Sequence, residues 1–203
     1  MSGDNMSFFP KDPVKIKARI KSYENALKKE FKTHGFYDDG YGKRYLLGPL
    51  YVLLRDYKGA IKHFEWFETT FSDDIGEPYQ YLCWILSLYK TGNLEKAKKK
   101  IYETMFMNLY LIPFVLGIDQ PNLPIWHGTN LAEKLYALEC PKELIKLWDT
   151  EARKFLNEVW FNPETEKIRN QYTSLLKDLN KEDDRDTRGS ILNKIRELKN
   201  RSN

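Results

Sequence analysis

The amino-acid sequence predicts an all-α fold of antiparallel helix-turn-helix repeats with flanking N- and C-terminal helices. Apolar residues recur every three or four positions along most of the chain, and no stretch shows the sustained alternation of a strand. A pattern of helix, polar turn and helix also occurs twice in the middle of the sequence. The chain has 203 residues, 41% of them hydrophobic. That is enough to bury a core as one helical domain, or at most two small ones.

Residues 1–70 are expected to contain three helices. The first begins near Pro13 and is marked by one apolar stripe: Val14, Ile16, Ile20, Tyr23, Leu27 and Phe31. The Gly-rich stretch 34–42 ends it. A second helix is expected to run to about Leu54, and a third from Tyr57 to about Thr70.

A helix that is apolar on nearly every side is expected at the centre of the fold. Residues 72–78 form a polar loop by composition, and residues 79–90 carry apolar side chains almost all round. Such a helix must be covered on most sides. Residues 91–93 end it, and an amphipathic helix is expected over about 94–105.

The pattern is more broken in the second half of the chain. The stretch 116–129 contains two prolines and is expected to be the longest internal loop. Two helices are expected over about 130–138 and 141–159. Apolar residues of the charged tail then recur at heptad-like spacing: Ile168, Tyr172, Leu175, Leu176, Leu179, Ile191, Ile195 and Leu198.

Charge and composition divide the chain into three parts. An N-terminal helix with a Gly-rich connector occupies residues 1–41, the repeats 42–161, and a charged helical extension 162–203. Residues 1–34 hold eight basic and four acidic side chains (+4), whereas 35–78 hold five basic and eight acidic ones (−3). The overall charge of +4 is too small to indicate nucleic acid or membrane by itself. The alternating charges are interpreted mainly as solvated helix faces.

Two segments, 44–64 and 81–101, share the pattern of helix, turn and helix. Each places a small residue, Ala60 or Ala97, four positions before a large apolar one. Antiparallel helices approach closely only where a side chain is small. The turns are expected to cap the second helix of each pair through two side chains: Asp56 and Asn93.

These segments resemble the tetratricopeptide repeat, a helix-turn-helix unit of about 34 residues. The matching residues of the first segment are Leu47, Gly48, Tyr51, Asp56, Tyr57, Ala60 and Phe64. Those of the second are Trp84, Leu88, Gly92, Asn93, Leu94, Ala97 and Ile101. The chain departs from the family pattern at Pro49 inside the first helix, at Ile85 in place of a small residue, and in lacking the closing proline. The resemblance spans about 42–104 and implies a superhelix of stacked helix pairs capped by the flanking helices.

The resemblance also implies a concave groove for a peptide, lined by the first helix of each pair. The corresponding residues here are Tyr45, Pro49, Leu82, Leu86, Tyr89 and Lys90. Members of the family that clamp a C-terminal carboxylate use Lys and Asn there, and only Lys90 resembles them. The expected groove is therefore apolar and aromatic. The alternative is that these residues pack against the terminal helices.

No motif indicates catalysis, a cofactor or a metal. The histidines His34, His63 and His127 are scattered, and no Cys/His spacing suggests zinc. The carboxylates of the 73–77 loop are interpreted as helix caps, with a divalent cation as the alternative. Trp126 and His127, in the long loop, form a secondary candidate site.

The chain is therefore expected to be a non-enzymatic interaction or scaffold protein that binds another polypeptide. The alternative is a nucleic-acid-associated helical protein that uses its basic terminal helices. No apolar run is long enough to cross a bilayer, so no membrane partner is expected, and residues 1–10 show no secretory signal. Cys83 and Cys140 fit reduced thiols in the cytoplasm. The partner and the oligomeric state stay open.

Overall fold

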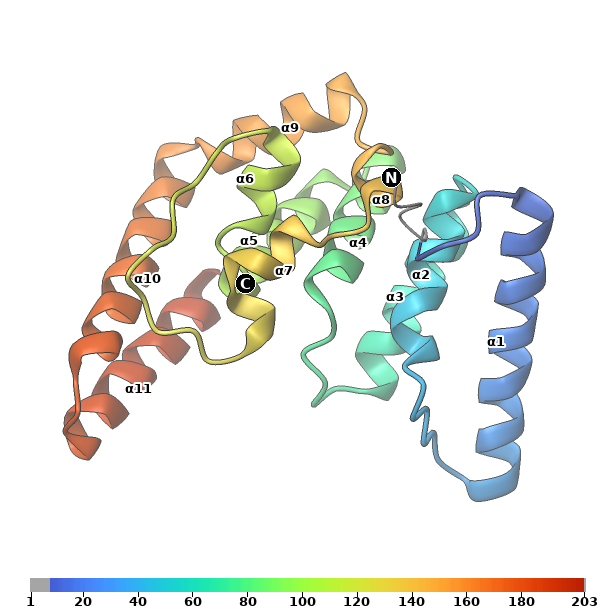
Figure 1. Cartoon of the computed structure of the whole chain (residues 1–203), viewed down its shortest axis with the longest axis horizontal. Helices are drawn as coiled ribbons and strands as arrows, with labels where there is room; N and C mark the ends of the chain where they lie inside the picture. Colours follow the sequence, from blue (N-terminus) through green and yellow to red (C-terminus); the bar gives the residue numbers. More distant parts are fainter. Residues whose placement is uncertain (1–7, 203) are drawn as a thin grey trace, which may run out of the picture. The chain divides into compact units, whose positions relative to one another are not determined.

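The regular secondary structure of the chain is helical throughout the residues described by the computed structural model, 8–202 (Figure 1). About 72% of the structure is helix, and the described residues contain no strand. The predicted all-α fold is confirmed. The first seven residues of the predicted N-terminal part lie outside the described range.

The chain forms two compact units. Unit 1 comprises Met1–Asn93 with Pro141–Leu147, and unit 2 comprises Leu94–Cys140 with Trp148–Asn203, as far as these residues are described. The predicted divisions after residues 41 and 161 rest on composition and charge, and they stay a prediction.

Unit 1 is built around helix α2. Its helices are α1 (Pro13–His34), α2 (Lys43–Leu53), α3 (Tyr57–Thr70), α4 (Pro78–Lys90) and α8 (Lys142–Ile145). Helix α2 contacts all four others, and α3 also contacts α4. Figure 1 shows α1 lying alongside α2.

Local sequence signals explain where these helices begin and end. The Asp12 carboxylate accepts the N–H of Val14 at 2.8 Å, and α1 ends at Gly35, whose φ of 75° favours glycine. Helix α3 begins where the Asp56 carboxylate accepts the N–H of Gly59 at 2.9 Å. The predicted cap at Asp56 is therefore confirmed.

Helices α2 and α3 form a close antiparallel pair because Gly48 has no side chain. A Cβ atom at Gly48 would lie 2.0 Å from Cε1 of Phe64, a ring that is fully buried. Phe64 in turn stacks on Trp84 of α4, with ring centroids 5.2 Å apart. Ala60 is also fully buried. The small residues of the first repeat thus lie in the packed core, as the pattern predicts. Helix α2 runs through Pro49 and ends four residues later.

Unit 2 consists of short helices followed by a C-terminal hairpin. Its elements are α5 (Leu94–Met107), α6 (Leu111–Leu116), the 3-10 helix η1 (Asn130–Ala132), α7 (Lys134–Leu138), α9 (Thr150–Trp160), α10 (Pro163–Lys181) and α11 (Arg185–Ser202). Helix α6 contacts α5, α7 and α9, while α10 and α11 contact each other and α5. The second predicted repeat pair, α4 and α5, is divided between the two units.

Helix α6 was not expected from the sequence. It lies in the apolar stretch 105–118, and Asn108 and Gly117, which interrupt that stretch, flank the helix. The side chain of Asn108 accepts the N–H of Tyr110 at 2.8 Å just before the helix, and Gly117 ends it with a φ of 75°. Pro113 lies in the first turn, where the helix needs no N–H donor.

Two predicted helices are broken in the structure. The helix expected over 130–138 is a 3-10 turn followed by α7, with Glu133 extended between them. The helix expected over 141–159 is divided into α8 and α9. The helix begins anew at α9 because the Asp149 carboxylate accepts the N–H of Ala152 at 3.0 Å and caps it.

We expect Gly48→Ala to lower the free energy of unfolding by about 1–3 kcal/mol, because the new methyl group overlaps the buried Phe64 ring. Alanine is a better helix former than glycine by about 1 kcal/mol, so helix propensity alone predicts that the substitution raises the free energy of unfolding. Gly189→Ala in α11 is the matched control, since nothing lies within 4 Å of a Cβ there. Urea denaturation followed by circular dichroism measures both, and equal effects would refute the close α2–α3 packing.

Candidate functional site

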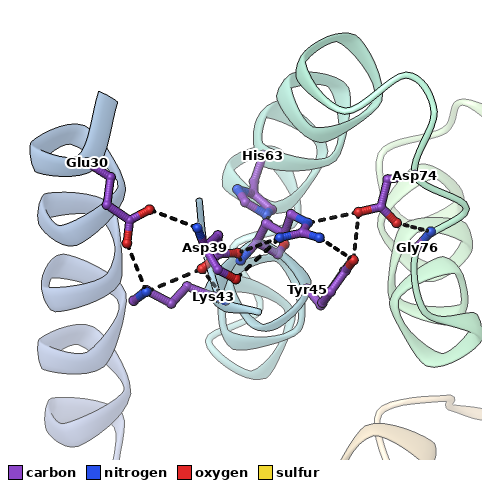
Figure 2. Close-up of polar contacts among 8 residues, drawn as sticks. Glu30, Asp39, Lys43, Tyr45, His63, Asp74 and Gly76 are labelled. Carbon is purple, nitrogen blue, oxygen red and sulfur yellow. Dashed lines mark hydrogen bonds and ion pairs between the residues drawn. The ribbon is translucent and has the colours of Figure 1, made fainter. Parts of the chain in front are cut away.

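A buried carboxylate organises the start of α2. The side chain of Asp39 accepts the backbone N–H groups of Lys43 and Arg44, both at 2.8 Å, and also forms ion pairs with both side chains at 3.3 Å (Figure 2). Glu30 of α1 accepts the N–H of Asp39 at 3.1 Å and pairs with Lys43 Nζ at 3.3 Å. Asp39 thus caps the start of α2 and pairs with two of its cations, and with Glu30 it joins α1 to α2.

Arg44 extends this network to the connection between α3 and α4. Its Nε donates to Asp74 Oδ2 at 2.9 Å, and its Nη2 donates to the hydroxyl of Tyr45 at 2.6 Å. That hydroxyl donates to the same Asp74 oxygen at 2.6 Å. The other oxygen of Asp74 accepts the N–H of Gly76 at 2.9 Å (Figure 2). Two loops, 35–42 and 71–77, are thereby fixed to the N-terminal end of α2.

The network shifts the pKa values of its members in opposite directions. Burial acts to raise the pKa of Asp74, but hydrogen bonds from Tyr45, Gly76 and Arg44 outweigh it and hold that pKa below its usual value. Burial and the hydrogen bond to Asp74 raise the pKa of Tyr45 to about 12. At neutral pH the carboxylate is charged and the phenol is not.

His63 closes the network from α3. Its Nε2 lies 2.8 Å from the carbonyl oxygen of Arg44, so this nitrogen carries the proton and donates. Burial lowers the pKa of His63 to about 4. The ring is therefore neutral at pH 7 and acts as a hydrogen-bond donor that ties α3 to the start of α2.

Six apolar residues, five of them aromatic, lie in or next to the two fixed loops, and their side chains are exposed or half-buried. We call these residues the aromatic surface: Phe31, Phe36, Tyr37, Trp66, Phe71 and Ile75. Tyr37 links three of its members, with ring centroids 5.0 Å from Phe31, 5.3 Å from Trp66 and 5.6 Å from Phe71. Phe36 and Ile75 are 61% and 60% exposed. A hollow lined by residues 70–75 adjoins it.

One cation, Arg44, and two carboxylates, Asp38 and Asp73, border the aromatic surface. The guanidinium of Arg44 lies 4.9 Å from the centroid of the Phe71 ring, a cation–π contact that links the surface to the polar network. Asp38 and Asp73, one from each loop, are exposed. The arrangement offers apolar contact area with negative charge at its edge.

The groove residues expected from the repeat pattern do not form one open surface. Leu82 and Leu86 are each 1% exposed. Tyr45 is half-buried and contacts Asp74, a residue that lies shortly before the start of α4. Tyr89 lies in the last turn of α4. A helix rises 1.5 Å per residue, so about 16 Å of α4 separates its start from Tyr89. Lys90 Nζ lies 5.5 Å from the Tyr89 ring.

Trp126 and His127 fix the long loop of unit 2. The N–H of Trp126 donates to the carbonyl of Leu176 in α10 at 3.0 Å. The ring of His127 stacks on Tyr110, with centroids 6.1 Å apart. Both side chains are half-buried. They hold residues 117–129 against the helices of unit 2.

The acidic loop caps a helix. Glu77 forms a capping box with Gln80 at the start of α4, while Asp74 binds Arg44 and Tyr45. Over residues 8–202, no three His, Cys, Asp or Glu side chains gather to hold a metal ion. No helix in this range is long and apolar enough to cross a membrane.

Sequence reasoning did not identify the aromatic surface as a site. A signal was present, because aromatic residues are dense in two short segments, 31–37 and 64–71. Helical spacing alone assigns such residues to a core, and only the packing shows which of them stay at the surface.

Known proteins offer no match to this chain: no family model, no curated protein and no solved structure is significantly similar to it.

We expect unit 1 to lose stability as the pH falls from about 6.5 towards 4. The folded-state pKa of His63 is about 4, below its unfolded value of 6.5, so the unfolded chain binds the proton first. The depressed pKa of Asp74 adds a further loss only at lower pH, below its ordinary value of 3.8. Between pH 7 and pH 5 the loss from His63 is about 2 kcal/mol.

Urea denaturation of the wild type and of His63→Gln at both pH values measures this loss. The amide of Gln keeps a donor for the Arg44 carbonyl and does not titrate. A variant with the same pH dependence as the wild type would show that His63 is not the titrating group.

Proposed function

We propose that this chain is a non-catalytic helical-repeat protein, of the tetratricopeptide type, that binds another polypeptide through the aromatic surface of unit 1. The observation that carries the proposal is that two loops, held in place by a largely buried ion-pair network, present the exposed side chains of Phe36 and Ile75 beside half-buried aromatic rings. Contiguous exposed apolar side chains are typical of protein-interaction sites. A cytoplasmic location belongs to the proposal and rests on the buried thiols Cys83 and Cys140.

Rigidity of the two loops supports a binding role. Association costs less when the contact residues are already ordered. Asp39 and Asp74 fix the two loops, so the apolar side chains that the loops carry are positioned without a partner. Aromatic residues are also the commonest energetic anchors of interfaces.

The charges at the edge define the partner further. Asp38 and Asp73 are exposed, and residues 35–78 hold eight acidic against five basic side chains. The complementary partner is a segment with aromatic or aliphatic anchors flanked by Lys or Arg.

We expect a displayed library of random peptides, selected on the full chain, to yield sequences with apolar anchors and basic flanks. Phe36→Ala combined with Ile75→Ala should weaken the selected peptides about tenfold or more, because both side chains are mostly exposed contact area. Isothermal titration calorimetry measures affinity, and thermal melting of the same samples reports folding.

Phe161→Ala is the control, since Phe161 is an exposed ring, 49% accessible, in unit 2. It should leave affinity unchanged. Peptides that bind the double variant and the wild type equally would place the site elsewhere. Tyr45→Ala is unsuitable here because Tyr45 also holds Asp74.

Helix α1 supports a second candidate function, binding of nucleic-acid phosphates. Two of its carboxylates face α2, where Glu24 accepts from the Tyr51 hydroxyl and Glu30 pairs with Lys43. The lysines along its solvent side are all exposed: Lys15, Lys17, Lys21, Lys28, Lys29 and Lys32. This leaves a basic face about 26 Å long from Lys15 to Lys32, at 1.5 Å per residue.

For this candidate we expect the affinity for a labelled DNA duplex to fall steeply between about 50 and 200 mM salt, because phosphate contacts release counterions. Replacing Lys21, Lys28 and Lys32 by Gln should flatten the salt dependence in fluorescence anisotropy. Peptide binding at the aromatic surface should respond far less to salt. A flat dependence in the wild type would exclude this function.

A further inference from the structure

A separate hollow lies within unit 2, between α6, α7 and the loop that follows α6. Its volume is about 300 Å³. Its walls are mainly apolar, formed by Phe114, Ile118, Ala137 and Leu138. Ile118 and Leu138 are exposed at its mouth. The volume is at the lower end of the range of small-ligand pockets, about 300–1,000 Å³.

Hydrogen bonds of the loop hold the hollow open. Gly117 ends α6 with a φ of 75° and turns the chain away from the helix. The buried Tyr110 hydroxyl then accepts the N–H of Leu123 at 3.0 Å, and Trp126 binds Leu176. The loop is thus fixed at its far side, and its near side lines the hollow without filling it.

One cation lies at the wall of this apolar hollow. Lys134 Nζ is 3.5 Å from Asp119 Oδ1. The Lys134 side chain is 27% exposed, whereas that of Asp119 is 99% exposed. An ion pair with so exposed a partner contributes about 1 kcal/mol or less. Asp119 can therefore turn into solvent and leave Lys134 to another carboxylate.

We propose that this hollow binds an apolar monocarboxylate, with the apolar body against Phe114, Ile118 and Leu138 and the carboxylate on Lys134 in place of Asp119. This site goes beyond the proposed function, since it lies in unit 2 and uses no residue of the aromatic surface. Two sources share the chemistry: a free carboxylic acid with a medium-length alkyl chain, and the C-terminus of a polypeptide that ends in an apolar residue.

The first experiment titrates the full chain with three probes of about eight carbons each: octanoate, octanol and octylamine. Backbone amide shifts in nuclear magnetic resonance spectra locate and quantify binding. Octanoate should shift the amides of residues 117–120 and 134–138 and bind about tenfold or more tightly than octanol, because it adds a charge-assisted hydrogen bond. Octylamine should bind least. Equal affinities, or octanoate shifts elsewhere in the chain, would overturn the proposal.

Variants of Lys134 test the role of its charge. Lys134→Gln should reduce octanoate affinity about tenfold or more and leave octanol affinity unchanged, whereas Lys134→Arg should keep octanoate binding. Lys177→Gln, at an exposed position of α10, controls for the change in net charge. Octanoate affinity that is unchanged in Lys134→Gln would overturn the assignment.

A last comparison distinguishes the two sources. A short peptide ending in Leu is tested with a free and with an amidated C-terminus. If the peptide with the free C-terminus binds more tightly than octanoate does, the ligand is a polypeptide terminus. Binding of octanoate alone identifies a small carboxylic acid. If neither binds at millimolar concentration, the proposal fails, and the peptide selection on unit 1 is unaffected.

Discussion

Unit 1 depends on the position of one guanidinium, that of Arg44. It pairs with Asp39 ahead of α2 and with Asp74 ahead of α4, so a single side chain fixes both loops to the same end of α2. These groups are largely removed from water, and a charge left there without its partner is costly. The three side chains therefore act together to hold the two loops.

This network also explains why the rings outside it can remain at the surface. The loops obtain their order from buried charges and hydrogen bonds, so burial of their aromatic side chains is not needed to hold them. Arg44 bridges the two environments, with its ion pairs on one side and the Phe71 ring on the other. Function on loops held by a rigid framework is a common arrangement in proteins.

Unit 2 achieves order by a different means. Its long loop is held by hydrogen bonds from Trp126 and to Tyr110 and by the stacking of His127 on Tyr110. Between these points the chain does not fill the space beside α6, and an apolar hollow with one lysine results. Each unit thus has a candidate surface of its own, one built on ordered loops and the other on incomplete packing.

The sequence by itself determined the helical class, the bounds of α3 from Tyr57 to Thr70, the start of α1 and the small residues of the α2–α3 pair. These features depend on spacing and on caps within a few residues, which are local properties of the chain. Only the tertiary structure decided which apolar residues are covered. Leu82 and Leu86 match the lining of a groove but are buried, while Phe36 and Ile75 are exposed. It also decided that Asp74 meets Arg44 across 30 residues and that the helix expected over 141–159 is broken. Burial and pairing of this kind depend on remote segments, because a side chain is covered by whatever the fold brings against it.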